Sequence, residues 1–112
     1  MSKEKDVISL FQQAKPIFIA LGDENRQQIV ARLLQTYKLS VNEITEVVPL
    51  SRPAVSHHLK ILHDAGLVAV ERSGTQRYYH IDEAAIVHIE LLERLMAALR
   101  SCTNWQTTPT SK

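Results

Sequence analysis

The pattern of apolar and polar residues changes period twice along this chain. Through the first 65 residues, apolar side chains recur every three or four positions, which predicts a series of helices. Between Val68 and Ile81 they alternate instead, and the turn-forming run Ser73–Gln76 interrupts them, which predicts a β-hairpin. The helical period then returns, so we expect a last helix over residues 82–102, about 30 Å long.

Local signals place the boundaries of the first helices. Residues 6–21 are expected to form two short helices, because Pro16 interrupts the first apolar stripe and is best tolerated in the first turn of a new one. Asp23 is the expected N-cap of the next helix. The core face of that helix is predicted to carry Ile29, Val30, Leu33, Leu34 and Tyr37.

Residues 40–65 carry the signals of two further helices joined by a tight turn. Ser40 and Glu43 have the spacing of a capping box, which opens a helix through about residue 48. Ser51 is the expected cap of the second helix, and Pro53 falls in its first turn, where proline is tolerated. Gly66 suits the end of that helix.

The second of these helices has two faces of different character. Val55, Leu59 and Leu62 form one apolar stripe, and His58 lies beside it, where we expect a structural role. The outer face carries hydrogen-bonding side chains that suit base edges and phosphates: Arg52, Ser56, His57, Lys60 and Asp64. Such a helix can be held by its own domain through one face and offer the other to a groove of DNA.

Composition narrows the class of protein. A length of 112 residues with 45% hydrophobic residues predicts one ordered domain, 1–112. The net charge of +1 says little, but residues 52–80 hold four basic against two acidic side chains, although ordinary charge scatter would also produce this. Cys102 is the only cysteine, so no internal disulfide can form. The longest apolar run, Ile17–Leu21, is too short to span a membrane and no secretory signal is visible, so we expect a cytoplasmic protein.

A helix, a tight turn, a second helix and a β-hairpin make up the winged helix-turn-helix arrangement, a fold that is mainly α. Three linked motifs follow one another along the chain: Ala20–Arg26, then Ser51–Lys60 with Ala65–Val68, then Arg77–Tyr79. In these motifs the chain resembles the ArsR/SmtB family of bacterial repressors, over roughly residues 7–100. The resemblance implies a homodimeric transcription regulator that binds an imperfect inverted repeat in double-stranded DNA.

The candidate DNA contacts come from the second helix and from the hairpin, or wing. Arg52, Ser56 and His57 are expected to reach base edges, whereas Lys60 is expected to contact a phosphate. Arg72 and Arg77 flank the turn at Gly74 and could clamp phosphates. The alternative is an ordinary solvated surface. The full predicted set is Ser51, Arg52, Pro53, Ser56, His57, Lys60, Arg72, Gly74, Gln76 and Arg77.

The last helix carries two adjacent apolar stripes, whereas a helix that packs only on its own domain needs one. We therefore expect the terminal helices to form a dimer interface, the alternative being deeper burial of the last helix in its own core. The predicted interface residues are Val7, Leu10, Phe11, Ile89, Leu92, Met96 and Leu99.

Many members of the family sense metals, and the resemblance allows their ligand positions to be compared. Ser40 and Asn42 occupy the positions of a Cys-x-Cys pair, and neither is a ligand for soft metals. A second family site falls on residues 83, 85, 96 and 99, which are Glu83, Ala85, Met96 and Leu99. We therefore expect no metal at these sites and no cofactor. A site built from His88, Glu90 and Cys102 across a dimer remains open, as does an unidentified small-molecule or protein effector.

Three classes of function compete. The favoured one is a DNA-binding transcription regulator, more simply a repressor, because a small protein can act by occlusion. The second is a winged-helix module that binds proteins without reading DNA, since a fold does not determine function. An enzyme is disfavoured, because no paired carboxylates, nucleophile–base set or glycine-rich phosphate loop is recognisable.

Overall fold

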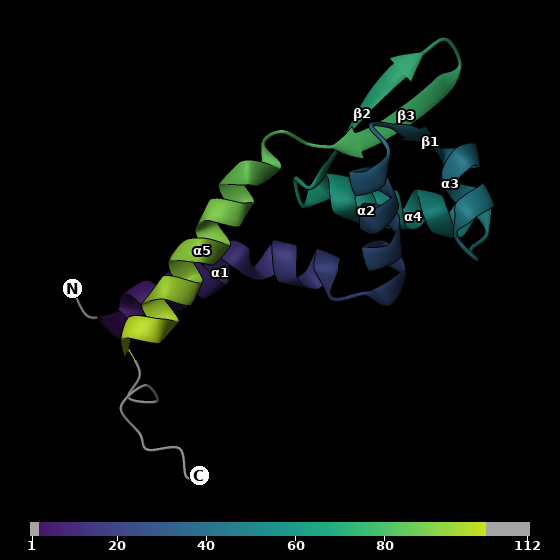
Figure 1. Ribbon diagram of the computed structural model, residues 1–112. Helices are drawn as coiled ribbons and strands as arrows, with labels where there is room; N and C mark the ends of the chain where they lie inside the picture. The colour runs from purple at the N-terminus through teal and green to yellow at the C-terminus, as the bar shows by residue number, and fades with distance from the viewer. Residues whose placement is uncertain (1–2, 103–112) are drawn as a thin grey trace. The chain divides into compact units, whose positions relative to one another are not determined.

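The computed structural model describes residues 3–102, and over this range it contains five helices and one three-stranded antiparallel sheet (Figure 1). The predicted fold class, mainly helical with a small β-hairpin, is confirmed. In chain order the elements are α1 (Lys3–Leu21), α2 (Glu24–Gln35), β1 (Leu39–Ser40), α3 (Val41–Val47), α4 (Arg52–Asp64), β2 (Val68–Ser73), β3 (Gln76–Ile81) and α5 (Ala85–Cys102).

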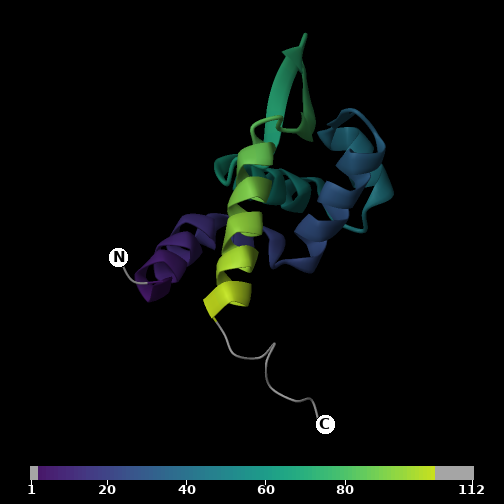
Figure 2. The same ribbon diagram turned by 60° about the vertical axis from the view of Figure 1, so that its left-hand side comes forward.

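The chain divides into two compact units. The first, called here the central unit, is Pro16–Ala85 and includes α2, α3, α4 and the sheet. The second, the terminal unit, joins Met1–Lys15 to Ile86–Lys112 and is described over residues 3–15 and 86–102. Within the central unit the hairpin of β2 and β3 projects away from the helices (Figures 1 and 2).

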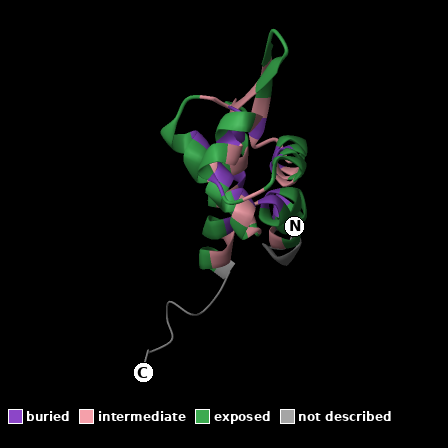
Figure 3. Ribbon diagram, turned by 90° about the vertical axis from the view of Figure 1, so that its right-hand side faces the viewer, coloured by how far each residue is buried: buried purple, intermediate pink, exposed green. Residues whose placement is uncertain are grey.

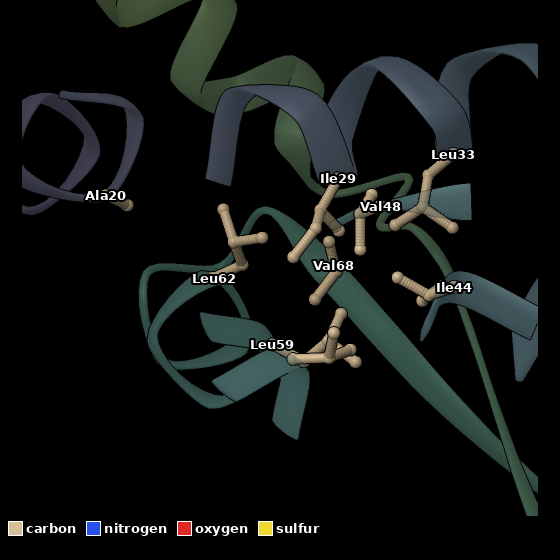
Figure 4. Packing of buried hydrophobic residues seen from close by; sticks show 9 residues of the cluster. Ala20, Ile29, Leu33, Ile44, Val48, Leu59, Leu62 and Val68 are labelled. Atoms are coloured by element: carbon tan, nitrogen blue, oxygen red, sulfur yellow. The ribbon is translucent and has the colours of Figure 1, made fainter. Parts of the chain in front are cut away.

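A single hydrophobic cluster forms the core of the central unit (Figure 4). Its residues come from the end of α1, from α2, from α3 and its C-cap, from α4 and from β2, so every one of these elements is held by the same core. Burying an aliphatic side chain of this size is worth roughly 1.5–3 kcal/mol. The cluster comprises Ala20, Ile29, Leu33, Ile44, Val48, Val55, Leu59, Leu62 and Val68.

The predicted helix caps are present. Asp23 Oδ2 accepts a hydrogen bond from the backbone N–H of Arg26 at 3.0 Å. Ser40 and Glu43 form the reciprocal capping box. At the end of α4, Gly66 has a φ of +80°, a left-handed conformation that glycine adopts without strain. Within residues 40–65 lie α3 and α4, and within residues 67–81 lie β2 and β3.

The sheet differs from the prediction in two details. The register pairs Val68 with Ile81 and Val70 with Tyr79. The turn is only Gly74 and Thr75, so the strands run further than the predicted four-residue turn allows. The strand β1, residues 39–40, pairs with β3 and was not predicted. Two residues are too few to show an alternating pattern, so this strand exists only because β3 lies beside it.

The prediction of two short helices at the N-terminus was wrong. The helix α1 is continuous from Lys3 to Leu21, with Pro16 inside it. Proline in a helix interior costs about 3 kcal/mol, because a hydrogen bond is lost and the ring crowds the preceding turn. Ala14 and Ile17, on either side of Pro16, are both buried, and this burial offsets the cost.

Two predictions about α2 and one about α5 also need correction. Leu34 and Tyr37 are 70% and 73% exposed rather than part of the core. The helix ends at Gln35, so Tyr37 lies beyond it, and its ring stacks on His80 with centroids 5.7 Å apart. The last helix begins at Ala85, not at residue 82, because residues 82–85 form a turn instead.

In the terminal unit, only one of the two predicted stripes of α5 is covered. Leu91 and Leu95 are buried, whereas Ile89 is 51% and Met96 is 60% exposed. Ala85, at the start of α5, is buried and belongs to the central unit. Figure 3 shows exposed positions along the helices and over the tip of the hairpin. Within residues 3–102 no helix is both long and apolar enough to cross a membrane.

Candidate nucleic-acid interface

The helix α4 has the two faces that the sequence predicts. Val55, Leu59 and Leu62 are fully buried in the core of the central unit, which fixes the rotation of the helix about its axis. With that rotation fixed, the opposite side chains must point outward, and all of them are exposed: Arg52, Ser56, His57, Lys60 and Asp64. Four of these five can donate hydrogen bonds, as base edges and phosphates require.

A buried arginine fixes α4 to the rest of the central unit. Arg26, only 8% exposed, donates from Nε to the carbonyl oxygen of Ala20 at 2.7 Å and from Nη2 to that of Ile19 at 3.1 Å. Its Nη1 lies 3.1 Å from Nδ1 of His58 on α4. A guanidinium only donates, so a hydrogen bond between the two side chains requires Nδ1 of His58 to be the acceptor. The predicted structural role of His58 is thereby confirmed.

Arg26 was missed at the level of sequence, although a signal was present. It precedes Ile29 by three residues and Leu33 by seven, so it occupies the buried face of α2. A charged residue at a core position indicates a buried hydrogen-bonding partner, because an unpaired buried charge is very costly. The identity of the partner, 32 residues away on α4, has no such local signal.

A cleft of about 780 Å³ lies between the helix-turn-helix and the wing. Of the predicted DNA contacts it includes Arg52, Ser56, Lys60, Gln76 and Arg77, whereas Ser51, Pro53, His57, Arg72 and Gly74 lie outside its lining. Its lining therefore joins the outer face of α4 to both strands of the hairpin. The remaining lining residues are Val41, Asn42, His63, Asp64, Val70, Thr75 and Tyr79.

Asp64 places a negative charge at the C-terminal end of α4. Lys60 Nζ contacts Asp64 Oδ2 at 3.0 Å, and this contact holds the pKa of Asp64 below its ordinary value. His63 Nδ1 also approaches Asp64 Oδ1, at 3.6 Å. An exposed pair of this kind contributes little to stability. Lys60 therefore remains able to turn towards a phosphate at small cost.

The wing presents two arginines opposite one another. Arg72 and Arg77 are Cα partners in the β2–β3 register, and both are exposed. Like charges directly opposite each other on a strand pair are destabilising. An anion such as a DNA phosphate would relieve that repulsion, which favours the predicted role of the pair.

The base of the wing is held by a separate group of contacts. Lys38 Nζ lies 3.2 Å from Glu71 Oε1 and 5.3 Å from the centroid of the Tyr78 ring. Glu71 Oε2 also lies 3.7 Å from Nε2 of His80. Glu71 pairs with Tyr78, next to the Arg72–Arg77 pair and further from the turn. Its contacts therefore position the strands at the base of the hairpin and not the residues at its tip.

Comparison with known proteins assigns the chain to a family. The sequence profile described as "Bacterial regulatory protein, arsR family" matches residues 23–70, from the N-cap of α2 into β2. An HTH-type transcriptional regulator of Mycobacterium tuberculosis is 39% identical over 79 residues, which are 70% of this chain and 73% of the relative. The chain belongs to the ArsR family.

Two further matches describe what this ArsR-family protein is similar to. The arsenical resistance operon repressor of Bacillus subtilis is 35% identical over 77 residues, 69% of this chain and 73% of the repressor. A homodimeric winged helix-turn-helix DNA-binding domain from Mycobacterium bovis superposes with a TM-score of 0.65 at 28% identity, covering 87% of each chain. The ArsR family comprises DNA-binding transcriptional regulators, not enzymes. This protein is therefore a transcriptional regulator with a DNA-binding winged helix-turn-helix.

The two residues at the positions of the family's Cys-x-Cys pair make other contacts in this ArsR-family protein. Ser40 caps α3, and Asn42 accepts a hydrogen bond from Arg52 through Oδ1. Across the part of the chain that the structure describes, no three His, Cys, Asp or Glu side chains gather as a metal site would require. The side chain of Cys102 lies outside the described residues, so the combination of His88, Glu90 and Cys102 stays a hypothesis.

Proposed function

We propose that this ArsR-family regulator is a homodimeric repressor that binds an inverted-repeat operator. The helix α4 would enter the major groove, which is wide enough for a helix, and the wing would contact the adjacent backbone. One observation carries the proposal: the core of the central unit buries Val55, Leu59 and Leu62 completely, so that the donor-rich face of α4 points outward into a cleft shared with the wing.

The predicted contacts divide by chemistry. Arg52, Ser56 and His57 would read base edges, because arginine donates to two acceptors of guanine and the other two can meet several bases. Lys60 and the arginine pair Arg72–Arg77 would contact phosphates, which position the protein without reading sequence. The remaining predicted contacts lie at the start of α4 and near the turn of the wing: Ser51, Pro53, Gly74 and Gln76.

Dimerisation would use the terminal unit, within a single winged-helix domain over 1–112. Ile89 and Met96 are exposed apolar residues on α5, and Leu92 and Leu99 beside them are half-buried. On α1, Val7 is half-buried and Phe11 is exposed, whereas Leu10 is already buried within the chain. The Mycobacterium bovis relative is a homodimer. A twofold axis would set two α4 helices about 34 Å apart, one turn of DNA.

The proposed signal is not a metal at the two family sites. Ser40, Asn42, Ala85 and Leu99 offer no thiolate, imidazole or carboxylate ligand there. Regulation would come from an unidentified small molecule, from a protein partner or from concentration, in the cytoplasm where the DNA is. Stoichiometric release of DNA by zinc or cadmium would overturn this part of the proposal.

The first experiment is fluorescence anisotropy with the full chain. The probes are duplex DNA from upstream of its own gene and a scrambled duplex, at two salt concentrations. We expect tight binding to the first that weakens steeply with salt, because counterions are released from phosphates. A protein-interaction module would show weak, equal binding to both probes.

A double variant tests which residues read the sequence. Arg52→Ala with His57→Ala should abolish the preference for the upstream duplex while leaving the dimer intact. An unchanged preference would show that α4 is not the reading helix. Leu34→Ala, at an exposed position of α2 outside the cleft lining, is the matched control.

A further inference from the structure

Asn42 is one of the cleft-lining residues that lie outside the predicted set of DNA contacts. It lies in the first turn of α3, and its side-chain Oδ1 accepts a hydrogen bond from Nη1 of Arg52, at the first position of α4. Both side chains are exposed and both line the cleft. The contact joins α3 directly to the first side chain of the reading helix.

The segment that carries Asn42 is held firmly. Ser40, two residues before Asn42, is buried and caps α3 through the capping box with Glu43. Ser40 also pairs with Tyr78 of the wing strand β3. A side chain on a short, doubly anchored turn offers its acceptor at a fixed place. Arg52, by contrast, is long, exposed and rich in rotamers, and fixing such a side chain on binding DNA costs conformational entropy.

The hydrogen-bonding capacity of arginine allows the contact to coexist with base recognition. A guanidinium has five N–H donors, and Asn42 uses one. Enough donors remain for the two acceptors that guanine presents in the major groove. The bond to Asn42 therefore need not break when Arg52 meets a base.

The geometry points to Asn42 as a positioning residue that determines specificity, by holding the guanidinium of Arg52 in the orientation in which it reads a base. This role rests on the proposed function, because it requires that α4 reads DNA sequence. Asn42 would act through Arg52 and not through a base contact of its own.

The test is a binding selection from a library of randomised DNA duplexes, with the full-length protein, in which bound and unbound duplexes are sequenced. Arg52→Ala should flatten base preference at a defined set of operator positions. We expect Asn42→Ala to flatten the same positions and no others, by about three- to tenfold, because the arginine then samples its rotamers. The double variant should be no worse than Arg52→Ala alone, since the two residues act as one unit.

Three further variants or measurements keep the result interpretable. Gln28→Ala removes an exposed amide on α2 outside the cleft lining and should leave every preference unchanged. Asn42→Asp keeps the acceptor and should keep the preference of the wild type, while lowering affinity for all duplexes by repelling phosphates. Asn42→Ala should fold normally, because alanine favours an exposed helix position, and thermal unfolding checks this.

Several results would overturn the role of Asn42. Unchanged preference in Asn42→Ala would do so, as would a loss of preference at positions that Arg52→Ala leaves intact, which would indicate a separate base contact. Additive losses in the double variant, or an equal loss at all positions with a lowered melting temperature, would also contradict it. Absence of any sequence preference in the wild type would instead overturn the proposed function, and this role with it.

Discussion

The central and terminal units differ in how they bury their apolar residues. In the central unit, nine residues from four helices and a strand form one buried cluster, and the outward face of α4 is polar. In the terminal unit, Leu91 and Leu95 are buried, while Ile89 and Met96 on the same helix are exposed. Because these two side chains are about half exposed, covering the rest of each would be worth roughly half of the 1.5–3 kcal/mol that full burial brings. The difference agrees with the proposed roles of the two units: DNA contact by the central unit and dimerisation by the terminal unit.

The largest effect is expected from breaking the core of the central unit. Leu59→Ala should lower the free energy of unfolding by about 2–5 kcal/mol, because a fully buried side chain leaves a cavity. Urea denaturation at one fixed protein concentration measures it. Leu34→Ala, at a 70% exposed position, should cost far less. Equal costs at the two sites would contradict the assignment of the core.

The exposed stripe of α5 is tested next. Ile89→Lys with Met96→Lys should raise the dimer dissociation constant by at least about 100-fold, because two charges per chain would be buried at the interface. Sedimentation velocity measures this. Glu93→Lys changes the charge at an exposed polar position of the same helix and should leave the dimer intact. A double variant that dimerises as tightly as the wild type would place the interface elsewhere.

The wing provides a smaller effect that involves only the central unit. Arg72→Ala and Arg77→Ala should each make the plot of log binding constant against log salt shallower, by about one unit for every phosphate that the variant no longer neutralises. Anisotropy over a salt series gives the slope. Arg94→Ala, on the exposed surface of α5, is the control and should not change it. Slopes that stay equal to that of the wild type would remove the wing from the DNA interface.

The smallest effect concerns acid stability at the start of α2. The backbone N–H of Arg26 holds the pKa of Asp23 below its ordinary value of 3.8. Stabilisation from this carboxylate is therefore complete above pH 3.8 and is lost as the pH falls through the lower, folded-state pKa. Asp23→Asn keeps a capping oxygen that does not titrate, so its stability should fall less between about pH 5 and pH 2 than that of the wild type. Parallel curves from urea unfolding would argue against this cap.

Features that depend on interactions between residues close in the chain could be predicted from the sequence. The caps at Asp23, Ser40 and Ser51 and the stop at Gly66 are visible in sequence because each bond spans only a few residues. The division of α4 into two faces is equally visible, since helical periodicity alone produces it. The continuity of α1 through Pro16 was not visible in the sequence, because burial at neighbouring positions outweighs the local preference of proline against a helix interior.

The candidate interface shows the same distinction. Sequence identified the hydrogen-bond donors on α4 and in the wing, and it predicted the hairpin that carries the wing, whose strands pair Val68 with Ile81 and Val70 with Tyr79. It did not predict that Tyr37 would leave the core and stack on His80, because the end of α2 decides where the tyrosine lies. Nor did it assign a role to Asn42, which only its hydrogen bond to Arg52 reveals.

By itself, then, the sequence determined the order of elements, the polar outer face of α4, the hairpin and the excess of apolar surface on α5. These properties depend on periodicity and on caps that span a few residues. Only the tertiary structure decided that Arg26 meets His58, that β1 joins β3, and that Asn42 meets Arg52. Each of these contacts joins residues on separate elements. Which residues meet depends on how the core packs those elements together.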